Sequence, residues 1–244
     1  MSQQRIKHVR LQTAVSLTQM RQFYHSTLGL AVLAENGSEL TLAAGQTTLT
    51  FVHTTPENGH PFYHFAFDIP ENKILAAYHW QRPLTPLLPL RPEKFAAMHD
   101  PQFPDEVVYL PDWNAHAIYF LDPAGSLVEY CARHSVPNQS EGAFSSQDLR
   151  YISEVGFVVN NIDTVAADIV AHTGLGHYRG TWTIGDEYGL ILLLRQAMPW
   201  GSVVGERPKG VFPTAVTLYG KRPLTYPVPN YPYTITIENR SLQP

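Results

Sequence analysis

The stretch Ile118-Tyr-Phe-Leu-Asp-Pro-Ala-Gly-Ser-Leu-Val-Glu129 reads as two β-strands joined by a turn. Its Asp-Pro-Ala-Gly segment is typical of a turn, and apolar residues dominate both flanks. Alternation along the second strand puts Glu129 on the face opposite Val128 and Tyr130. The large apolar neighbours can therefore pack against a helix while the Glu129 carboxylate points to the other side of the sheet.

Two strand openings elsewhere in the chain carry a histidine in the same situation. Residues 6–13 alternate so that His8 lies opposite apolar residues, and residues 62–69 do the same for His64. Two imidazoles and one carboxylate are the ligand set of a divalent iron-type site with open positions. If the three strands meet, His8, His64 and Glu129 hold a metal; the alternative is that they are ordinary polar residues of strands.

The order of patterns indicates an internal repeat of a β-α-β-β-β unit. The first unit covers residues 5–54 and the second covers residues 62–133, within an expected domain over residues 1–134. The expected elements are strand 6–13, helix 16–28, strands 31–35, 39–43 and 47–53, then strand 62–69, helix 71–81, a Pro-rich loop 82–105, and strands 106–110, 116–121 and 126–132.

A linker over residues 135–148 leads to a third, weaker unit. Its expected elements are a strand from Ile152, helix 162–173 and strands 178–184 and 189–195, followed by strand-like pieces at 214–218 and 233–238. Glu154 occupies the place that His8 and His64 hold in the first two units, but no clear partner ligand closes this unit. We therefore interpret residues 151–244 as a smaller, degenerate, related domain.

Two motifs resemble those of the vicinal oxygen chelate superfamily, which includes glyoxalase I, extradiol dioxygenases and antibiotic-resistance proteins. They are Phe23-Tyr-His-Ser-Thr-Leu-Gly-Leu30 and Ile118–Glu129, each following a strand histidine. The resemblance implies an α+β fold in which paired βαβββ units form a curved, eight-stranded cup around a metal. It also implies that ligands come from the first and last strands of a unit. Thr50 takes the fourth ligand place, where glyoxalase I has a carboxylate, which counts against glyoxalase activity.

The resemblance implies a metal-dependent enzyme, most like a ring-cleaving dioxygenase, that acts on a small substrate with vicinal oxygens. Tyr119 is similar to a tyrosine that hydrogen-bonds the substrate oxygen, and Arg10, Gln12 and Thr50 are expected to bind substrate in the cup. Fe(II) or Mn(II) is preferred, although Zn(II), Ni(II) or Co(II) also suits His and carboxylate ligands. The alternatives are a glyoxalase-type isomerase or lyase and a non-catalytic small-molecule binding protein.

The remaining candidate residues have weaker support. Alternation turns His53 and His116 away from the cup, whereas His60 and His99 lie in loops from which they could reach it. Cys131 is expected to be a small buried residue and not a nucleophile.

Composition limits the classes of partner. Charged residues make up 16% of the chain and the net charge is −4, so there is no basic field for nucleic acid. Long apolar runs that would span a membrane are absent, and the N-terminal residues do not resemble a signal peptide. With a single cysteine, the expected setting is cytoplasmic. The sequence allows a homo-oligomer but does not require one.

Overall fold

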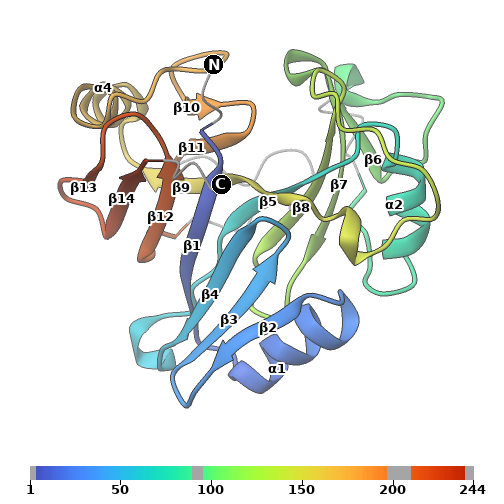
Figure 1. The fold of residues 1–244 in the computed structure, drawn as a ribbon, viewed down its shortest axis with the longest axis horizontal. Helices are drawn as coiled ribbons and strands as arrows, with labels where there is room; N and C mark the ends of the chain where they lie inside the picture. Colours follow the sequence, from blue (N-terminus) through green and yellow to red (C-terminus); the bar gives the residue numbers. More distant parts are fainter. Residues whose placement is uncertain (1–3, 90–95, 197–209, 240–244) are drawn as a thin grey trace.

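A computed structural model describes residues 4–89, 96–196 and 210–239, which form two mixed seven-stranded sheets with few helices. Strands from the two ends of the chain lie side by side in one of them, as the neighbouring blue β1 and red β12 show (Figure 1). The fold is α+β with paired βαβββ units, as predicted. No helix among the described residues is long and apolar enough to cross a membrane.

The first sheet, sheet A, has the strand order β13-β14-β12-β1-β4-β3-β2. Its strands are β1 (Ile6–Thr13), β2 (Ala31–Glu35), β3 (Glu39–Ala44), β4 (Thr47–His53), β12 (Thr214–Tyr219), β13 (Leu224–Pro227) and β14 (Tyr233–Glu238). The helix of this unit begins as α1 (Leu17–Arg21) and continues as a π-helix over Gln22–Thr27. Ser16 caps it, because its side chain accepts a hydrogen bond from the Gln19 amide at 3.3 Å.

The second sheet, sheet B, has the strand order β10-β11-β9-β5-β8-β7-β6. Its strands are β5 (His64–Ile69), β6 (Val107–Leu110), β7 (Ala115–Leu121), β8 (Leu127–Arg133), β9 (Tyr151–Val159), β10 (Thr183–Asp186) and β11 (Gly189–Arg195). Helices α2 (Ile74–Gln81) and α4 (Ile162–Thr173) belong to this half of the chain. Part of the expected loop 82–105 lies outside the described residues.

The pairing of units differs from the expected one. Strand β1 pairs antiparallel with β12, and β5 pairs antiparallel with β9. The first unit therefore shares a sheet with the C-terminal fragment, and the second unit shares a sheet with the third. Each sheet has seven strands instead of eight because the C-terminal partner contributes only three. Residues 151–244 thus contribute strands to both sheets.

The two motifs that carried the family resemblance meet in the core. Tyr24, from the helix of the first unit, is fully buried and donates a hydrogen bond to Asp122 Oδ2 at 2.9 Å. Asp122 opens the hairpin turn of the second unit, where its Oδ1 accepts from the Ser126 amide at 2.7 Å. Burial raises the pKa of Asp122 to about 6. This contact joins the helix of the first unit to the turn that leads into β8.

Candidate metal centre

His64 is the first residue of β5 and is 6% exposed. Its Nδ1 lies 3.1 Å from the backbone carbonyl oxygen of Leu127. A carbonyl can only accept, so Nδ1 carries the proton, and Nε2, which faces Glu129 and Glu154, is the nitrogen that could ligate a metal. Burial lowers the pKa of His64, which keeps the ring neutral. The ring is therefore in the form that ligates a metal.

Glu129 on β8 and Glu154 on β9 reach the same point from either side of β5. In the sheet register, Ala66 of β5 pairs with both Glu129 and Glu154. The Nε2 atom of His64 lies 3.5 Å from Glu129 Oε2 and 3.9 Å from Glu154 Oε2. One ligand atom from each of the three side chains lies within 4.8 Å of the others, and all three residues are buried. This group, His64, Glu129 and Glu154, is called the metal centre below.

The negative charge of the buried Glu129 carboxylate is only partly compensated by its neighbours. Its Oε1 atom is buried and has no hydrogen-bond partner among the described residues. Burial and the neighbouring charge of Glu154 raise the pKa of Glu129 to about 8. A buried carboxylate beside a second carboxylate costs free energy unless a cation neutralises the pair. The donor set therefore fits a divalent ion.

Arg133 holds the third ligand in place from the other side. This residue is 1% exposed, and its guanidinium donates hydrogen bonds to Glu154 Oε1 and, at 2.9 Å, to Ser153 Oγ. It also lies 3.5 Å from the carboxylate of Asp68. Because Arg133 binds Oε1 of Glu154, the Oε2 atom that faces His64 stays directed at the metal centre.

The fourth ligand place of this cup holds an apolar residue. In the second unit His64 pairs with Leu127, and Glu129 follows two residues later along β8. In the third unit Glu154 pairs with Leu190, so the residue equivalent to Glu129 is Leu192. Leucine cannot ligate, which would leave coordination positions of an ion open to substrate and water. Two carboxylates and one imidazole form a harder donor set than the predicted one, and suit Mn(II) or Fe(II).

Tyr119 lies directly across from Glu129 in the β7–β8 pair. Its ring centroid is 6.5 Å from that of His64. Burial, and the charge of Glu129, raise the pKa of Tyr119 well above its ordinary value, so the phenol stays protonated. Tyr119 therefore lies beside Glu129 and His64, and its catalytic role remains a proposal.

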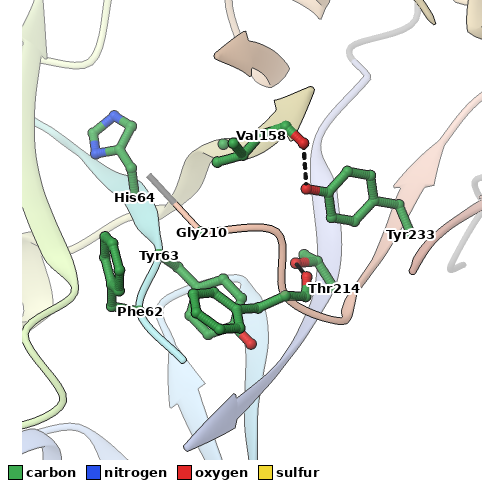
Figure 2. Close-up of a pocket in the computed structure, with 9 residues that line it drawn as sticks. Phe62, Tyr63, His64, Val158, Gly210, Thr214 and Tyr233 are labelled. Carbon is green, nitrogen blue, oxygen red and sulfur yellow. Dashed lines mark hydrogen bonds between the residues drawn. The ribbon is translucent and has the colours of Figure 1, made fainter. Parts of the chain in front are cut away.

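Apolar side chains surround the phenol and the imidazole. Phe62, Leu127 and Tyr119 form a buried cluster against which Leu88, Leu194 and Phe212 pack. Gly156 of β9 faces His64 closely, since a Cβ at this position would lie 3.4 Å from the His64 Cβ and 2.8 Å from Leu194. Figure 2 shows His64 and Phe62 on one side of a small pocket, with Val158 and Tyr233 on the other. The three residues of the metal centre are only 2–6% exposed.

His8 is not brought to this group. It lies on β1 in sheet A, whereas His64, Glu129 and Glu154 belong to sheet B. The Nε2 atom of His8 is 2.9 Å from Thr50 Oγ1, which in turn is 3.0 Å from Thr41 Oγ1. Of the expected set of His8, His64 and Glu129, the structure brings His64 and Glu129 together and puts Glu154 where His8 was expected. The reason is that β5 pairs with β9 and not with β1.

The predicted substrate-binding residues Arg10, Gln12 and Thr50 also lie in sheet A. Arg10 forms a two-point ion pair with Glu39, with nitrogen–oxygen distances of 3.0 and 2.5 Å. None of these residues belongs to the metal centre. Arg10 and Gln12 line a separate cavity of sheet A, and Thr50 is buried beside His8.

The other histidines lie elsewhere. His53 and His60 are exposed, and His99 is 3.9 Å from Asp105. His116 is buried away from the ligands, with Nδ1 2.8 Å from His134 Nε2. Cys131 is 1% exposed in β8, which agrees with the expected small buried residue.

The residue that sequence reasoning missed is Glu154. A signal was present, because Glu154 stands at the strand opening of the third unit as His8 and His64 do in theirs. It was discounted because the third unit has no second ligand of its own. The structure supplies the partners from the second unit instead.

The sequence matches no protein-family model and no curated protein. Among solved structures, a proposed dioxygenase from Bacillus subtilis subsp. subtilis str. 168 is similar over 97% of this chain and 86% of its own, with 13% identity and a TM-score of 0.57. A V278E mutant of glyoxalase I from Zea mays is similar over 97% and 92%, with 12% identity and a TM-score of 0.51. At these identities the likeness concerns the fold. The chain has the fold of the vicinal oxygen chelate superfamily, to which these solved neighbours belong.

Proposed function

We propose that this protein is a metal-dependent enzyme that acts on a small substrate with two adjacent oxygens, and that its reaction is a ring-cleaving dioxygenation. The observation that carries the proposal is the buried group of His64, Glu129 and Glu154, whose ligand atoms lie within 4.8 Å of one another. Leu192 at the fourth place favours an ion with positions left for substrate. The site thus offers three ligands, in contrast to a site in which all four places carry a ligand.

A bound Fe(II) or Mn(II) would supply Lewis-acid and redox chemistry at this point. The chain's own residues hold and shield the substrate. The phenol of Tyr119, kept protonated by burial, can donate a hydrogen bond to a substrate oxygen beside Glu129. Phe62 and Phe212, whose ring centroids are 5.8 Å apart, give the small pocket beside His64 an apolar wall.

A glyoxalase-type isomerase or lyase is the second candidate. It is favoured by the second carboxylate. The group has two buried glutamates and one histidine, whereas the ligand set expected for a ring-cleaving dioxygenase has two histidines and one glutamate. A second buried carboxylate at this point could accept a proton from a carbon acid. This candidate needs no oxygen.

The ligand set is tested by the metal content of the protein purified without chelator. We expect Glu154→Gln, Glu129→Gln and His64→Ala to lose the metal, each by a large factor. His8→Ala is the matched control, because it removes a strand histidine that lies outside the group. Retention of metal by Glu154→Gln, or its loss in His8→Ala, would refute the assignment of ligands.

The reaction is tested on protein loaded with Fe(II) or Mn(II). Oxygen uptake with catechols would support the dioxygenase, and isomerisation of glutathione hemithioacetals without oxygen uptake would support the second candidate. Saturable ligand binding without turnover would contradict both and indicate a binding protein.

A further inference from the structure

The polar face of sheet A carries a cavity of about 220 Å³. Its walls come from the four strands β1, β4, β12 and β14 and the segments before two of them, and include Arg10, Gln12, Val52, Pro213, Ala215 and Thr234. Alternation explains this face: Val9 and Leu11 of β1 are buried in the core, whereas Arg10 and Gln12 point the other way and are partly exposed. No member of the metal centre lines the cavity.

The register shows how this face relates to the metal centre. In sheet B, Ala66 pairs with Glu129 and Glu154. At the same place in sheet A, Arg10 pairs with Thr50 and Ala215. The two ligating carboxylates are thus replaced by a hydroxyl and a methyl group, and the small Ala66 is replaced by a guanidinium. Sheet A presents a fixed cation where sheet B presents ligands for one.

The polar groups on this face have unused hydrogen-bonding capacity. The Arg10 side chain is 40% exposed, and its ion pair with Glu39 uses only part of the five N–H groups of a guanidinium. The side-chain amide of Gln12 and the hydroxyl of Thr234 make no hydrogen bond within the part of the chain that the structure describes. Among the described residues that line the cavity there is one cation and no carboxylate. This combination recognises an anionic oxygen group.

The remaining walls are apolar, and the volume limits the ligand. Val52, Pro213 and Ala215 offer carbon surface beside the guanidinium. A cavity of about 150 Å³ accommodates one benzene molecule, so 220 Å³ has room for a single ring and a small polar substituent. We infer that sheet A holds a second, metal-independent binding site for a single-ring monocarboxylate, with its carboxylate at Arg10 and its ring against Val52 and Pro213.

This site is separate from the metal centre but shares a wall with its surroundings. Thr214 lines both the cavity of sheet A and the small pocket beside His64 (Figure 2). The Tyr63 phenol joins the two regions. It donates to the Pro213 carbonyl oxygen and accepts from the backbone N–H of Gln12, both at 3.0 Å. A test must therefore show on which side of this wall the ligand binds. The inference does not depend on the proposed function.

The experiment is a calorimetric titration of metal-free, chelator-treated protein with benzoate, and with benzyl alcohol as the uncharged analogue. We expect saturable 1:1 binding of benzoate, and binding of benzyl alcohol weaker by about tenfold or more, because a charge-assisted hydrogen bond is lost. Arg10→Met should weaken benzoate binding by a similar factor. Glu39→Gln should strengthen it, because the carboxylate that competes for Arg10 becomes neutral.

Lys7→Met is the matched control. Lys7 is also a cation of β1 paired with a carboxylate, Glu238 at 2.6 Å, but it does not line the cavity. Its substitution should leave benzoate binding unchanged, as should His64→Ala in the metal centre. Absence of saturable binding, equal losses in the Arg10 and Lys7 variants, or loss of binding in His64→Ala would each overturn the inference. The metal content of the same variants separates this result from the test of the proposed function.

Discussion

The affinity of the metal centre for its ion should depend on pH through Glu129. Burial and the neighbouring Glu154 raise the pKa of Glu129 to about 8, and a carboxylate must be deprotonated to ligate. Below this pH, the ion therefore displaces a proton from the Glu129 carboxyl group. The lowered pKa of His64 means that its imidazole is already neutral near pH 7 and releases none.

One displaced proton fixes the size of the effect. The apparent Kd should rise by about tenfold for each pH unit below the pKa, which is about 1.4 kcal/mol per unit. Between pH 8, where the carboxyl group is half protonated, and pH 6 the loss of affinity is therefore roughly fiftyfold. Above pH 8 the affinity should level off, because the free carboxylate is then already ionised.

The folding stability of the metal-free protein should change with pH in the direction opposite to the metal affinity. The pKa of Glu129 rises from 4.5 to about 8 on folding, so the folded state holds this proton more tightly. The stabilisation from this group is fully present below about pH 4.5 and is lost as pH rises through about 8. A bound ion should reverse this loss of stability at high pH, because it replaces the proton on Glu129.

The assay is calorimetry with Mn(II) at pH 6, 7 and 8, in two buffers with different heats of ionisation, which counts the protons released. We expect close to one proton per ion at pH 6 and 7. Glu129→Gln is the control: its binding should be weaker at every pH and lack this dependence on pH. An affinity that stays constant from pH 6 to 8 with no proton release would show that Glu129 is already ionised, and the electrostatic reasoning would be wrong.

Three further predictions concern single residues. Arg133→Met should lower the free energy of unfolding, measured in urea, by about 3–5 kcal/mol, because it leaves buried carboxylates without their cation; a loss below about 1 kcal/mol would contradict this. Tyr119→Phe should keep the metal content and lower turnover by roughly a hundredfold, since one hydrogen-bond donor to the reacting oxygen is removed; unchanged turnover would exclude that role. Gly45→Ala should cost about 2 kcal/mol or more, because its φ is +60° and a Cβ would lie 2.1 Å from the Arg150 carbonyl oxygen. Gly37→Ala, where a Cβ meets nothing within 4 Å, is the control and should stay within about 0.5–1 kcal/mol of the parent.

Local elements could be predicted from the sequence because their signals are local. The helix predicted over 162–173 is α4, Ile162–Thr173, which Asn161 and Gly174 bound as caps. The strand predicted over 178–184 was misplaced, since β10 is Thr183–Asp186. Its pattern is weak because glycines, a tryptophan and charged residues interrupt the alternation. The expected helix 16–28 changes to a π-helix after Arg21, which side-chain spacing does not encode.

The pairing of units could not be predicted in the same way. An alternating strand shows which face it buries, but its two hydrogen-bonding edges look alike in the sequence. The edges of β1 and β5 could pair with each other or with later strands, and only long-range packing decides between them. His64 and Glu129 were found because both lie in one unit. The third ligand depended on the choice of edge, and so His8 was predicted in place of Glu154.

The pairing of β5 with β9 also determines which strands a bound ion would hold together. His64 and Glu129 come from the second unit, and Glu154 comes from the third, so an ion bound by all three links β8, β5 and β9. Without the ion, Glu129 keeps its proton below about pH 8, and above that pH its repulsion with Glu154 acts directly across β5 and opposes the β5–β9 pair. Arg133 offsets part of this repulsion from the Glu154 side, but Glu129 Oε1 has no partner among the described residues. A bound ion would therefore tie the ligand set to the pairing of units two and three, because it would complete the contact that the paired strands alone leave uncompensated.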